Sequence, residues 1–292
     1  MPDWDIAIIG GGASGLTAAA TAAANGLSTL LIDRMGGGGE LMNLGPLHGL
    51  DEPLTGPDLF TRLLEDTIAA GAELSVAEVT GLTQTPTGWR IATGGGTHHA
   101  RAVILAIGLA PGTMGIGNEQ DFEGQGLSHC AACDGPLYAG QPVVVAGGDR
   151  WAQQEARDLA AIASSVTLVT QGAPSPAMEN VAVIPGHVTA LEGAGGLESV
   201  TVQADDGSTP QRLPASAIFV QTGRRPALHF APETLARDPN GRLIVSEALE
   251  TSLPALFAAG DARAGSPGTF TAAMDDGRRA ASAPLGKTAK PE

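Results

Sequence analysis

The segment "DIAIIGGGASGLTAAATAAANGLSTLLID" (Asp5–Asp33) predicts a strand, a glycine turn, a helix and a second strand in immediate succession. Four apolar residues follow Asp5 and lead into Gly10, as in a buried strand of a parallel sheet. An alanine-rich run from Ser14 to about Ala24 predicts a helix, and Ser28–Ile32 predicts the next strand. The segment therefore indicates the βαβ unit of an α/β fold.

Three glycines in the turn, Gly10, Gly12 and Gly15, fit the G-x-G-x-x-G pattern of dinucleotide-binding folds. The first permits a tight turn, the second lets the backbone approach a pyrophosphate, and the third lets helix and strand pack closely. Asp33, at the end of the second strand, is placed to accept from a ribose hydroxyl. A glycine turn without a ligand is the alternative, and the strand–helix–strand context and the acid both count against it.

A second unit of the same kind begins with the strand Val143–Ala146. A helix is expected from about Ala152 to Ala163, and a strand over Val166–Val169. We therefore predict an α/β fold with two Rossmann-like (three-layer ββα) domains, the second inserted into the first. The predicted outer domain spans residues 1–112 and 224–292, and the predicted inserted domain spans residues 113–223.

Composition excludes several classes of protein. The formal net charge of the 292 residues is −15, and the two lysines are Lys287 and Lys290. Such a chain repels nucleic acid and anionic membranes. No apolar run is long enough to span a bilayer, and the N-terminus lacks a basic segment of the kind that precedes a signal sequence. We expect a cytoplasmic protein.

The two cysteines of the chain are Cys130 and Cys133, in "HCAACDG". In a reducing compartment such a pair indicates redox or metal chemistry. A zinc site needs two further ligands, and neither a second cysteine pair nor suitably spaced histidines supplies them. We therefore expect a redox pair and no metal. A cysteine at a helix start has a lowered thiol pKa, and an adjacent carboxylate can move protons.

Five segments together resemble the low-molecular-weight thioredoxin reductases and their flavoprotein relatives, over nearly the whole chain. They are "IIGGGASGLTAA" (8–19), "LTGPDL" (54–59), "AVILAIGLAP" (102–111), "HCAACDG" (129–135) and "TSLPALFAAGD" (251–261). The resemblance implies an FAD-dependent disulfide oxidoreductase that is a homodimer. It also implies that the outer domain binds FAD and that the inserted domain is of the NADPH-binding type.

The resemblance places the FAD contacts on residues from both parts of the outer domain. These are Gly10, Gly12, Gly15, Asp33, Glu40, Gly260, Asp261, Thr269 and Phe270. Asp261 is expected at the ribityl or pyrophosphate portion, and the helix that follows is expected to point its N-terminus at the flavin ring. Two departures affect the flavin contacts: Gly268 and Thr269 replace a usual Arg-Gln pair, and Glu40 stands where relatives often carry glutamine.

The resemblance also assigns roles around the cysteines. Cys133 is expected to contact the flavin and to form its charge-transfer complex, while Cys130 exchanges with the substrate. Asp134 matches the acid that handles the thiol protons. His129 is expected either to tune the pair or to serve the structure.

The nucleotide turn of the inserted domain departs from the family pattern. The expected G-x-G-x-x-A reads Gly147, Gly148, Asp149, Arg150, Trp151, Ala152. A carboxylate at Asp149 repels a pyrophosphate, and Trp151 is large enough to fill the nucleotide cleft.

The contacts to the nucleotide's ribose and 2′-phosphate are also missing from the sequence. No lysine or arginine lies between Arg157 and Arg212, where relatives carry a basic cluster, and no acid ends the strand Val166–Val169. We therefore expect that NADPH is not used efficiently.

Several functions are compatible with a flavoprotein of this type that does not use NADPH efficiently. The first is a disulfide reductase that takes electrons from another donor, such as ferredoxin, and acts on a thioredoxin-like protein or a small disulfide. The second is an oxygen-dependent oxidase of small dithiols; some relatives of that type carry a histidine in the position of His129. An NADPH-dependent thioredoxin reductase with an unusual pocket and a non-catalytic flavin redox sensor are further alternatives.

Overall fold

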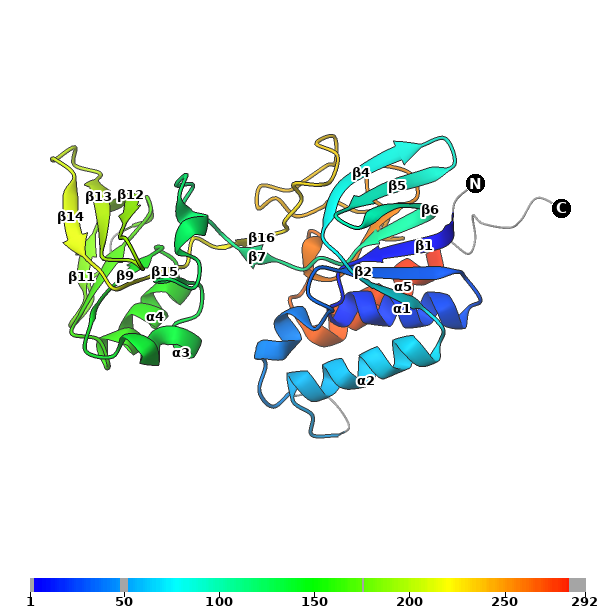
Figure 1. The fold of residues 1–292 in the computed structure, drawn as a ribbon, viewed down its shortest axis with the longest axis horizontal. Coiled ribbons are helices and arrows are strands. Elements are labelled where there is room, and N and C mark those ends of the chain that lie inside the picture. Colours follow the sequence, from blue (N-terminus) through cyan, green and yellow to red (C-terminus); the bar gives the residue numbers. More distant parts are fainter. Residues whose placement is uncertain (1–2, 48–51, 175, 284–292) are drawn as a thin grey trace. The chain divides into compact units, whose positions relative to one another are not determined.

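The computed structural model describes residues 3–47, 52–174 and 176–283, and it divides into two compact units (Figure 1). Unit 1 comprises Met1–Ala110 and Arg225–Glu292, and unit 2 comprises Pro111–Arg224. The chain passes between them through β7 (Ala110–Pro111) and β16 (Arg224–Arg225), which pair with each other. The predicted class, α/β with two Rossmann-like units of which the second interrupts the first, is confirmed. Both lysines lie outside the described residues.

Unit 1 is built on a mixed sheet with the strand order β3-β2-β1-β6-β5-β4, and β17 also pairs with β6. Its elements in chain order are β1 (Trp4–Ile9), α1 (Ala13–Ala24), β2 (Thr29–Asp33), η1 (Gly39–Asn43), α2 (Gly56–Ala69), β3 (Glu73–Val76), β4 (Val79–Thr85), β5 (Gly88–Thr93), β6 (Gly96–Leu105), β17 (Leu256–Ala258), η4 (Gly260–Ala262) and α5 (Phe270–Ser282).

The long strand β6 joins two kinds of pairing. Its first half, from Gly96 to Ala100, pairs antiparallel with β5, and its second half, from Ala100 to Leu105, pairs parallel with β1. The three residues at its end also pair parallel with β17. The chain after unit 2 thus returns to the centre of the sheet that the N-terminal residues began.

A layer of three helices covers one face of this sheet (Figure 1). Alanines of α1, among them Ala18 and Ala22, are fully buried, and their small side chains let α5 pack closely. At Gly277 the two helices are so close that an added Cβ atom would lie 2.3 Å from the carbonyl oxygen of Ser14. The opposite face buries a second cluster that includes Trp89, Ile91 and Phe230. This packing fixes the first turns of α1 against the middle of α5.

Unit 2 repeats the arrangement with a parallel sheet of order β11-β10-β9-β15-β8 and a separate antiparallel sheet, β12-β13-β14. Its elements are β8 (Leu127–Ser128), α3 (Ala131–Asp134), η3 (Gly135–Tyr138), β9 (Pro142–Ala146), α4 (Arg150–Ala160), β10 (Ser165–Val169), β11 (Ala182–Ile184), β12 (Gly186–Glu192), β13 (Ser199–Ala204), β14 (Gln211–Pro214) and β15 (Ala217–Val220), preceded by η2 (Glu119–Phe122). One apolar cluster joins the two sheets and another joins the parallel sheet to α3 and α4.

Several local expectations were wrong or incomplete. His98 and His99, polar residues that give no strand signal in the sequence, lie within β6, and the turn before it is made by Gly94 and Gly95. Helix α4 begins at Arg150 rather than near Ala152 and ends three residues earlier than expected. Strands β4, β12 and β14 have no counterpart in the sequence prediction, because they are partly or largely exposed and lack a continuous apolar run.

Candidate functional site

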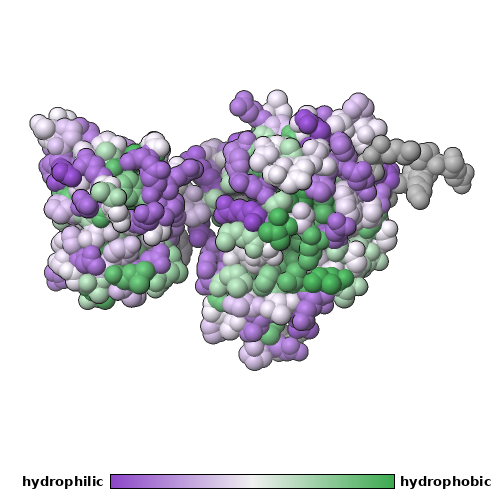
Figure 2. Space-filling model, viewed as in Figure 1, coloured by the Kyte–Doolittle hydropathy of each residue, from purple (hydrophilic) through white to green (hydrophobic). Residues whose placement is uncertain are grey.

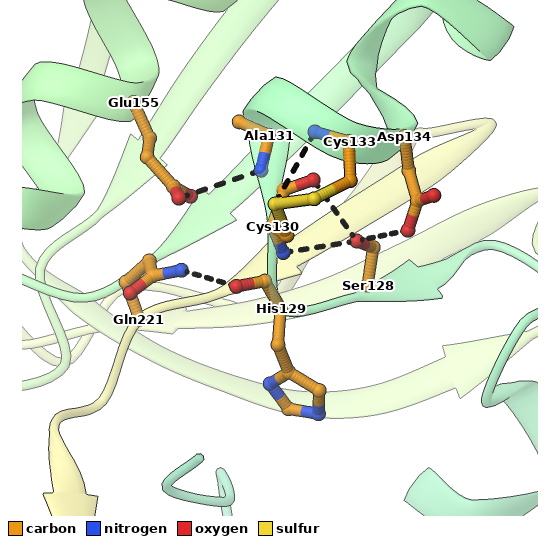
Figure 3. The surroundings of a disulfide bond; sticks show 8 residues. All are labelled: Ser128, His129, Cys130, Ala131, Cys133, Asp134, Glu155 and Gln221. Atoms are coloured by element: carbon orange, nitrogen blue, oxygen red, sulfur yellow. Dashed lines mark hydrogen bonds between the residues drawn. A yellow bond between two sulfur atoms is a disulfide. The ribbon is translucent and has the colours of Figure 1, made fainter. Parts of the chain in front are cut away.

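The two cysteines form a disulfide at the start of a four-residue helix in unit 2 (Figure 3). Cys130 is the N-cap of α3, and its Sγ atom accepts from the backbone N–H of Cys133 at 3.2 Å. Cys133 is exposed and Cys130 is partly buried. The pair is therefore closed, and one of its sulfurs is held by a backbone donor that can also stabilise a thiolate.

Asp134 is connected to the disulfide through Ser128. The hydroxyl of Ser128 donates to Oδ2 of Asp134 at 2.7 Å and accepts from the backbone N–H of Cys130 at 3.1 Å. The sequence singled out Asp134 but not Ser128. A serine one residue before "HC" offered no distinguishing signal, and it is the end of β8 that brings its hydroxyl to α3.

The ring of His129 points away from the disulfide (Figure 3). Its Nδ1 lies 3.3 Å from the carbonyl oxygen of Val220, and its Nε2 lies 3.0 Å from Oε1 of Glu123. Its own carbonyl oxygen accepts from Nε2 of Gln221 at 2.9 Å. These contacts tie the residue after β8 to the end of β15. Of the two roles expected for His129, tuning the cysteine pair and supporting the structure, they favour the second.

A second carboxyl group, Glu155 of α4, reaches the other side of the cysteine helix (Figure 3). Its Oε1 accepts from the backbone N–H of Ala131 at 3.4 Å, and its Oε2 is buried without a hydrogen-bond partner among the described residues. Burial raises the pKa of this carboxyl above its ordinary value, an effect only partly offset by the Ala131 N–H and by Gln221. Glu155 was not predicted from the sequence, because it is 24 residues from Ala131 and reaches it only in the fold.

The glycine turn of unit 1 has the geometry that a phosphate-binding turn needs. Gly10 has φ +103°, and a Cβ on Gly15 would lie 1.8 Å from the carbonyl oxygen of Gly10. A Cβ on Gly12 would meet nothing within 4 Å. Within the described residues no side chain caps α1, and the buried hydroxyl of Ser14 in its first turn has no hydrogen-bond partner. The N-terminus of α1 thus offers free donors beside an open approach.

The carboxylate of Asp33 is held by the backbone around the turn. Its Oδ2 accepts from Gly11 N at 2.8 Å, and its Oδ1 accepts from the N–H groups of Met35 and Gly37 at 2.8 and 2.9 Å. These bonds fix the loop after β2 against the glycine turn. Both oxygens therefore have backbone donors in addition to any contact with a ribose.

The C-terminal part of unit 1 brings Gly260 to the same turn. Its Cα is close enough that an added Cβ would lie 3.1 Å from the Cβ of Ser14. The neighbouring Asp261 accepts from the hydroxyl of Ser266 at 2.7 Å. Thr269 caps α5 by accepting from Ala272 N at 3.3 Å, and Phe270 is its partly buried first residue.

Asp276 of α5 fixes Gly260 in this place. Its side chain is 2% exposed, and Oδ2 accepts from the N–H of Gly260 at 3.1 Å. Arg263 forms a two-point ion pair with the same carboxylate. This pair was not predicted from the sequence, because a buried acid in "MDDGRR" cannot be told from its neighbours by pattern. Glu40, the last of the predicted cofactor residues, is exposed on η1.

The corresponding turn of unit 2 is filled by the protein itself. Asp149 is the N-cap of α4, and its Oδ1 accepts from the N–H groups of Trp151 and Ala152 at 3.0 and 2.9 Å. The chain after β10 folds over the turn, because a Cβ on Gly148 would lie 2.1 Å from the Cβ of Ala173. Trp151, which is large enough to fill a nucleotide cleft, is 61% exposed, and the Arg150 guanidinium lies over its ring.

The sequence profile of the pyridine nucleotide-disulphide oxidoreductases matches residues 4–277. The chain belongs to this family. A thioredoxin reductase of Treponema pallidum is 32% identical over 96% of both chains. Among solved structures, a Lactococcus lactis thioredoxin reductase is 27% identical with a TM-score of 0.75, covering 96% of this chain and 97% of that one. A ferredoxin-flavin thioredoxin reductase of Clostridium acetobutylicum is 27% identical with a TM-score of 0.56, covering 97% of both chains.

Membership of the pyridine nucleotide-disulphide oxidoreductases makes this chain a flavin-dependent disulfide oxidoreductase of the thioredoxin reductase type. The residues of unit 1 fit FAD: the uncapped helix α1, the free Ser14 hydroxyl and the open space at Gly12 suit a pyrophosphate. When bound, the flavin supplies a two-electron acceptor and donor. Within the described range, no helix is long and apolar enough to cross a membrane. No cluster of three metal-ligating side chains occurs in the same residues.

Proposed function

We propose that this protein passes electrons between FAD and the Cys130/Cys133 pair without efficient use of NADPH. The observation that carries the proposal is the hydrogen bonding of Asp149 at the N-terminus of α4. A dinucleotide pyrophosphate binds to the free N–H groups at this helix end. Here a carboxylate already accepts from two of them, and its charge repels a phosphate.

Two further features of unit 2 support the same conclusion. Ala173 packs on Gly148, so the backbone that a pyrophosphate would approach is covered by the chain. Thr170 follows β10 in place of an acid, and its hydroxyl is buried. With no lysine or arginine between Arg157 and Arg212, neither NADH nor NADPH has its usual ribose or phosphate contact.

A protein electron donor of the ferredoxin type is the source of electrons that we propose. The similarity to a ferredoxin-flavin thioredoxin reductase over 97% of both chains supports it. The net charge of −15 implies that docking of such a donor uses a local basic surface rather than the overall field. We propose a thioredoxin-like protein or a small disulfide as the acceptor, a homodimer as the assembly, and a cytoplasmic location.

The site residues have separate roles in this proposal. Cys130 exchanges with the disulfide of the substrate, and Cys133 exchanges electrons with the flavin. Asp134, held by Ser128, handles the thiol protons. Gly10, Gly12, Gly15 and Gly260 let the backbone approach the cofactor, as their positions around the N-terminus of α1 permit.

The deciding experiment is anaerobic mixing of the purified flavoprotein with excess NADPH and, separately, with a simple dithiol, while the oxidised-flavin absorbance is followed. We expect no bleaching with NADPH and bleaching with the dithiol. Rapid bleaching by NADPH would contradict the proposal and would identify an ordinary NADPH-dependent reductase.

The rate at which air re-oxidises the reduced flavin then distinguishes the remaining functions. Fast recovery of flavin absorbance in air, with catalytic turnover of the dithiol, would favour the dithiol oxidase. Slow recovery in air, together with fast reduction by a reduced ferredoxin, is the result we expect. A flavin that neither reagent reduces would indicate a redox sensor without turnover.

A further inference from the structure

Glu155 is a carboxyl group at the dithiol to which the proposed electron transfer assigns no part. Its Oε1 lies 3.4 Å from the nitrogen of Ala131, which is joined by one peptide bond to Cys130. Asp134 is the last residue of the same short helix, and its carboxylate is linked to the backbone N–H of Cys130 through the Ser128 hydroxyl (Figure 3). The disulfide is thus flanked by two carboxyl groups on different elements.

The two carboxyl groups differ in their surroundings. Oδ2 of Asp134 accepts from a hydroxyl, whereas Oε2 of Glu155 is buried and, among the described residues, has no hydrogen-bond partner. A buried carboxylate oxygen without a donor is costly, and the cost is removed when the group is protonated. Burial accordingly raises the pKa of Glu155.

The charges that face Glu155 do not cancel this effect. Asp158, one turn further along α4, raises its pKa, while Arg224 of β16 and the neutral Gln221 and Ala131 N–H lower it. His129 and Asp134 lie on the far side of the cysteine helix, and the His129 ring is turned toward Glu123. A thiolate on Cys130 would therefore form one residue away from the backbone N–H that binds a poorly solvated carboxylate.

We propose that Glu155 and the thiol of Cys130 share one proton in the dithiol form, so that the reactive thiolate forms with the proton resident on Glu155. In the exchange step the Cys130 proton moves to the Glu155 carboxylate. The thiolate then attacks the substrate disulfide; a new S–S bond forms, the old one breaks, and the second substrate sulfur leaves as a thiolate. Glu155 is a positioning residue here, because it acts through the charge state of Cys130. This inference rests on the proposed function, in which Cys130 is the interchange thiol.

A shared proton has a measurable signature. Below the pH at which Glu155 ionises, the fraction of Cys130 in the thiolate form should rise with pH as it does for an isolated thiol. Above it, the population with the proton on Glu155 should become constant, so thiolate stops rising until the second proton of the pair leaves. Such a plateau belongs to a coupled pair of titrating groups and not to a single thiol.

The experiment uses the full-length flavoprotein with Cys133→Ser, so that Cys130 is the one remaining thiol. Its rate of alkylation by iodoacetamide is measured from pH 5 to 10, with and without Glu155→Gln. Glutamine keeps the acceptor for Ala131 N–H but cannot ionise. We expect a plateau in the parent and a single rise in the Gln variant. The two curves should coincide at acid pH, and the Gln variant should react about tenfold faster near neutrality, as expected for one unit of thiol pKa.

Asp158→Asn is the matched control, because it removes the same charge from the same helix at an exposed position. Its profile should stay within about twofold of the parent, as for a screened surface charge. Superimposable profiles for the parent and Glu155→Gln would overturn the shared proton while leaving the dithiol function intact. Failure of a simple dithiol to open Cys130–Cys133 in the wild-type protein would instead count against the proposed function itself.

Discussion

Asp149 and Gly12 occupy the same place in the two units, at the N-cap of the helix that follows the first strand. Their backbones are nearly identical, with φ/ψ of −77°/176° for Asp149 and −81°/−169° for Gly12. At Gly12 the space where a side chain would begin is open, and at Asp149 a carboxylate accepts from Trp151 N and Ala152 N. The amides at the start of α1 have no side-chain acceptor, whereas two amides at the start of α4 already donate to a carboxylate.

Removing the Asp149 carboxylate from the turn before α4 should not restore NADPH use. The double substitution Asp149→Gly with Trp151→Ser frees the N-terminus of α4, but Ala173 still covers Gly148 and no basic cluster is present. We expect NADPH-dependent flavin reduction to remain at the wild-type background in stopped-flow absorbance. Substantial reduction by the double variant would show that the carboxylate alone excludes the nucleotide.

A carboxylate introduced at Gly12, in the turn before α1, should prevent flavin binding and leave the fold intact. In Gly12→Asp the new side chain enters free space, because a Cβ there meets nothing within 4 Å. Its carboxylate can cap α1 as Asp149 caps α4, and it then repels the FAD pyrophosphate. The ratio of flavin to protein absorbance should fall close to zero, with an unchanged far-ultraviolet circular dichroism spectrum.

Gly12→Ala is the control for this substitution, since it adds the same Cβ without the charge. It should keep most of the bound flavin. Equal flavin loss in both variants would assign the effect to bulk rather than to the anion.

Cys133→Ser should abolish the long-wavelength charge-transfer absorbance between thiolate and oxidised flavin. The reason is that the proposal makes Cys133 the thiol that contacts the flavin, and only a thiolate donates in such a complex. Cys130→Ser should retain the band, although both variants lose turnover. A band that survives in Cys133→Ser and disappears in Cys130→Ser would reverse the two assignments.

Asp276→Asn should destabilise unit 1 strongly. The side chains of Asp276 and Arg263 are 2% and 15% exposed, so the substitution leaves the Arg263 charge buried without its partner. Breaking a buried ion pair from one side costs about 3–5 kcal/mol. The loss should appear as a lower free energy of unfolding in urea, followed by flavin fluorescence.

The exposed second partner of Asp276 provides the comparison. Arg279 lies 3.6 Å from the same carboxylate but is 49% exposed. Its replacement by alanine should change the free energy of unfolding by no more than about 1 kcal/mol, as for other surface ion pairs. Similar losses for Arg279→Ala and Asp276→Asn would mean that burial does not decide the strength of this network.

Features of the structure were predicted from the sequence where the residues that form them lie close together along the chain. The βαβ segments were predicted because their strands are buried on both faces and read as continuous apolar runs. The half-exposed strands β4, β12 and β14 carry no such run. The cysteine pair and the altered turn at Asp149 were visible because all of their residues lie within a few positions of one another.

The sequence by itself determined the fold class, the family, the redox pair and the chemical misfit of Asp149 with a pyrophosphate, since each rests on side chains close together along the chain. Only the tertiary structure decided what surrounds these features. It showed that Asp149 binds the helix amides, that Ala173 covers Gly148, and that Glu155 reaches the cysteine helix. The physical reason is that burial and hydrogen bonding depend on which distant segments the sheet and helices bring together, and neither is encoded in local spacing.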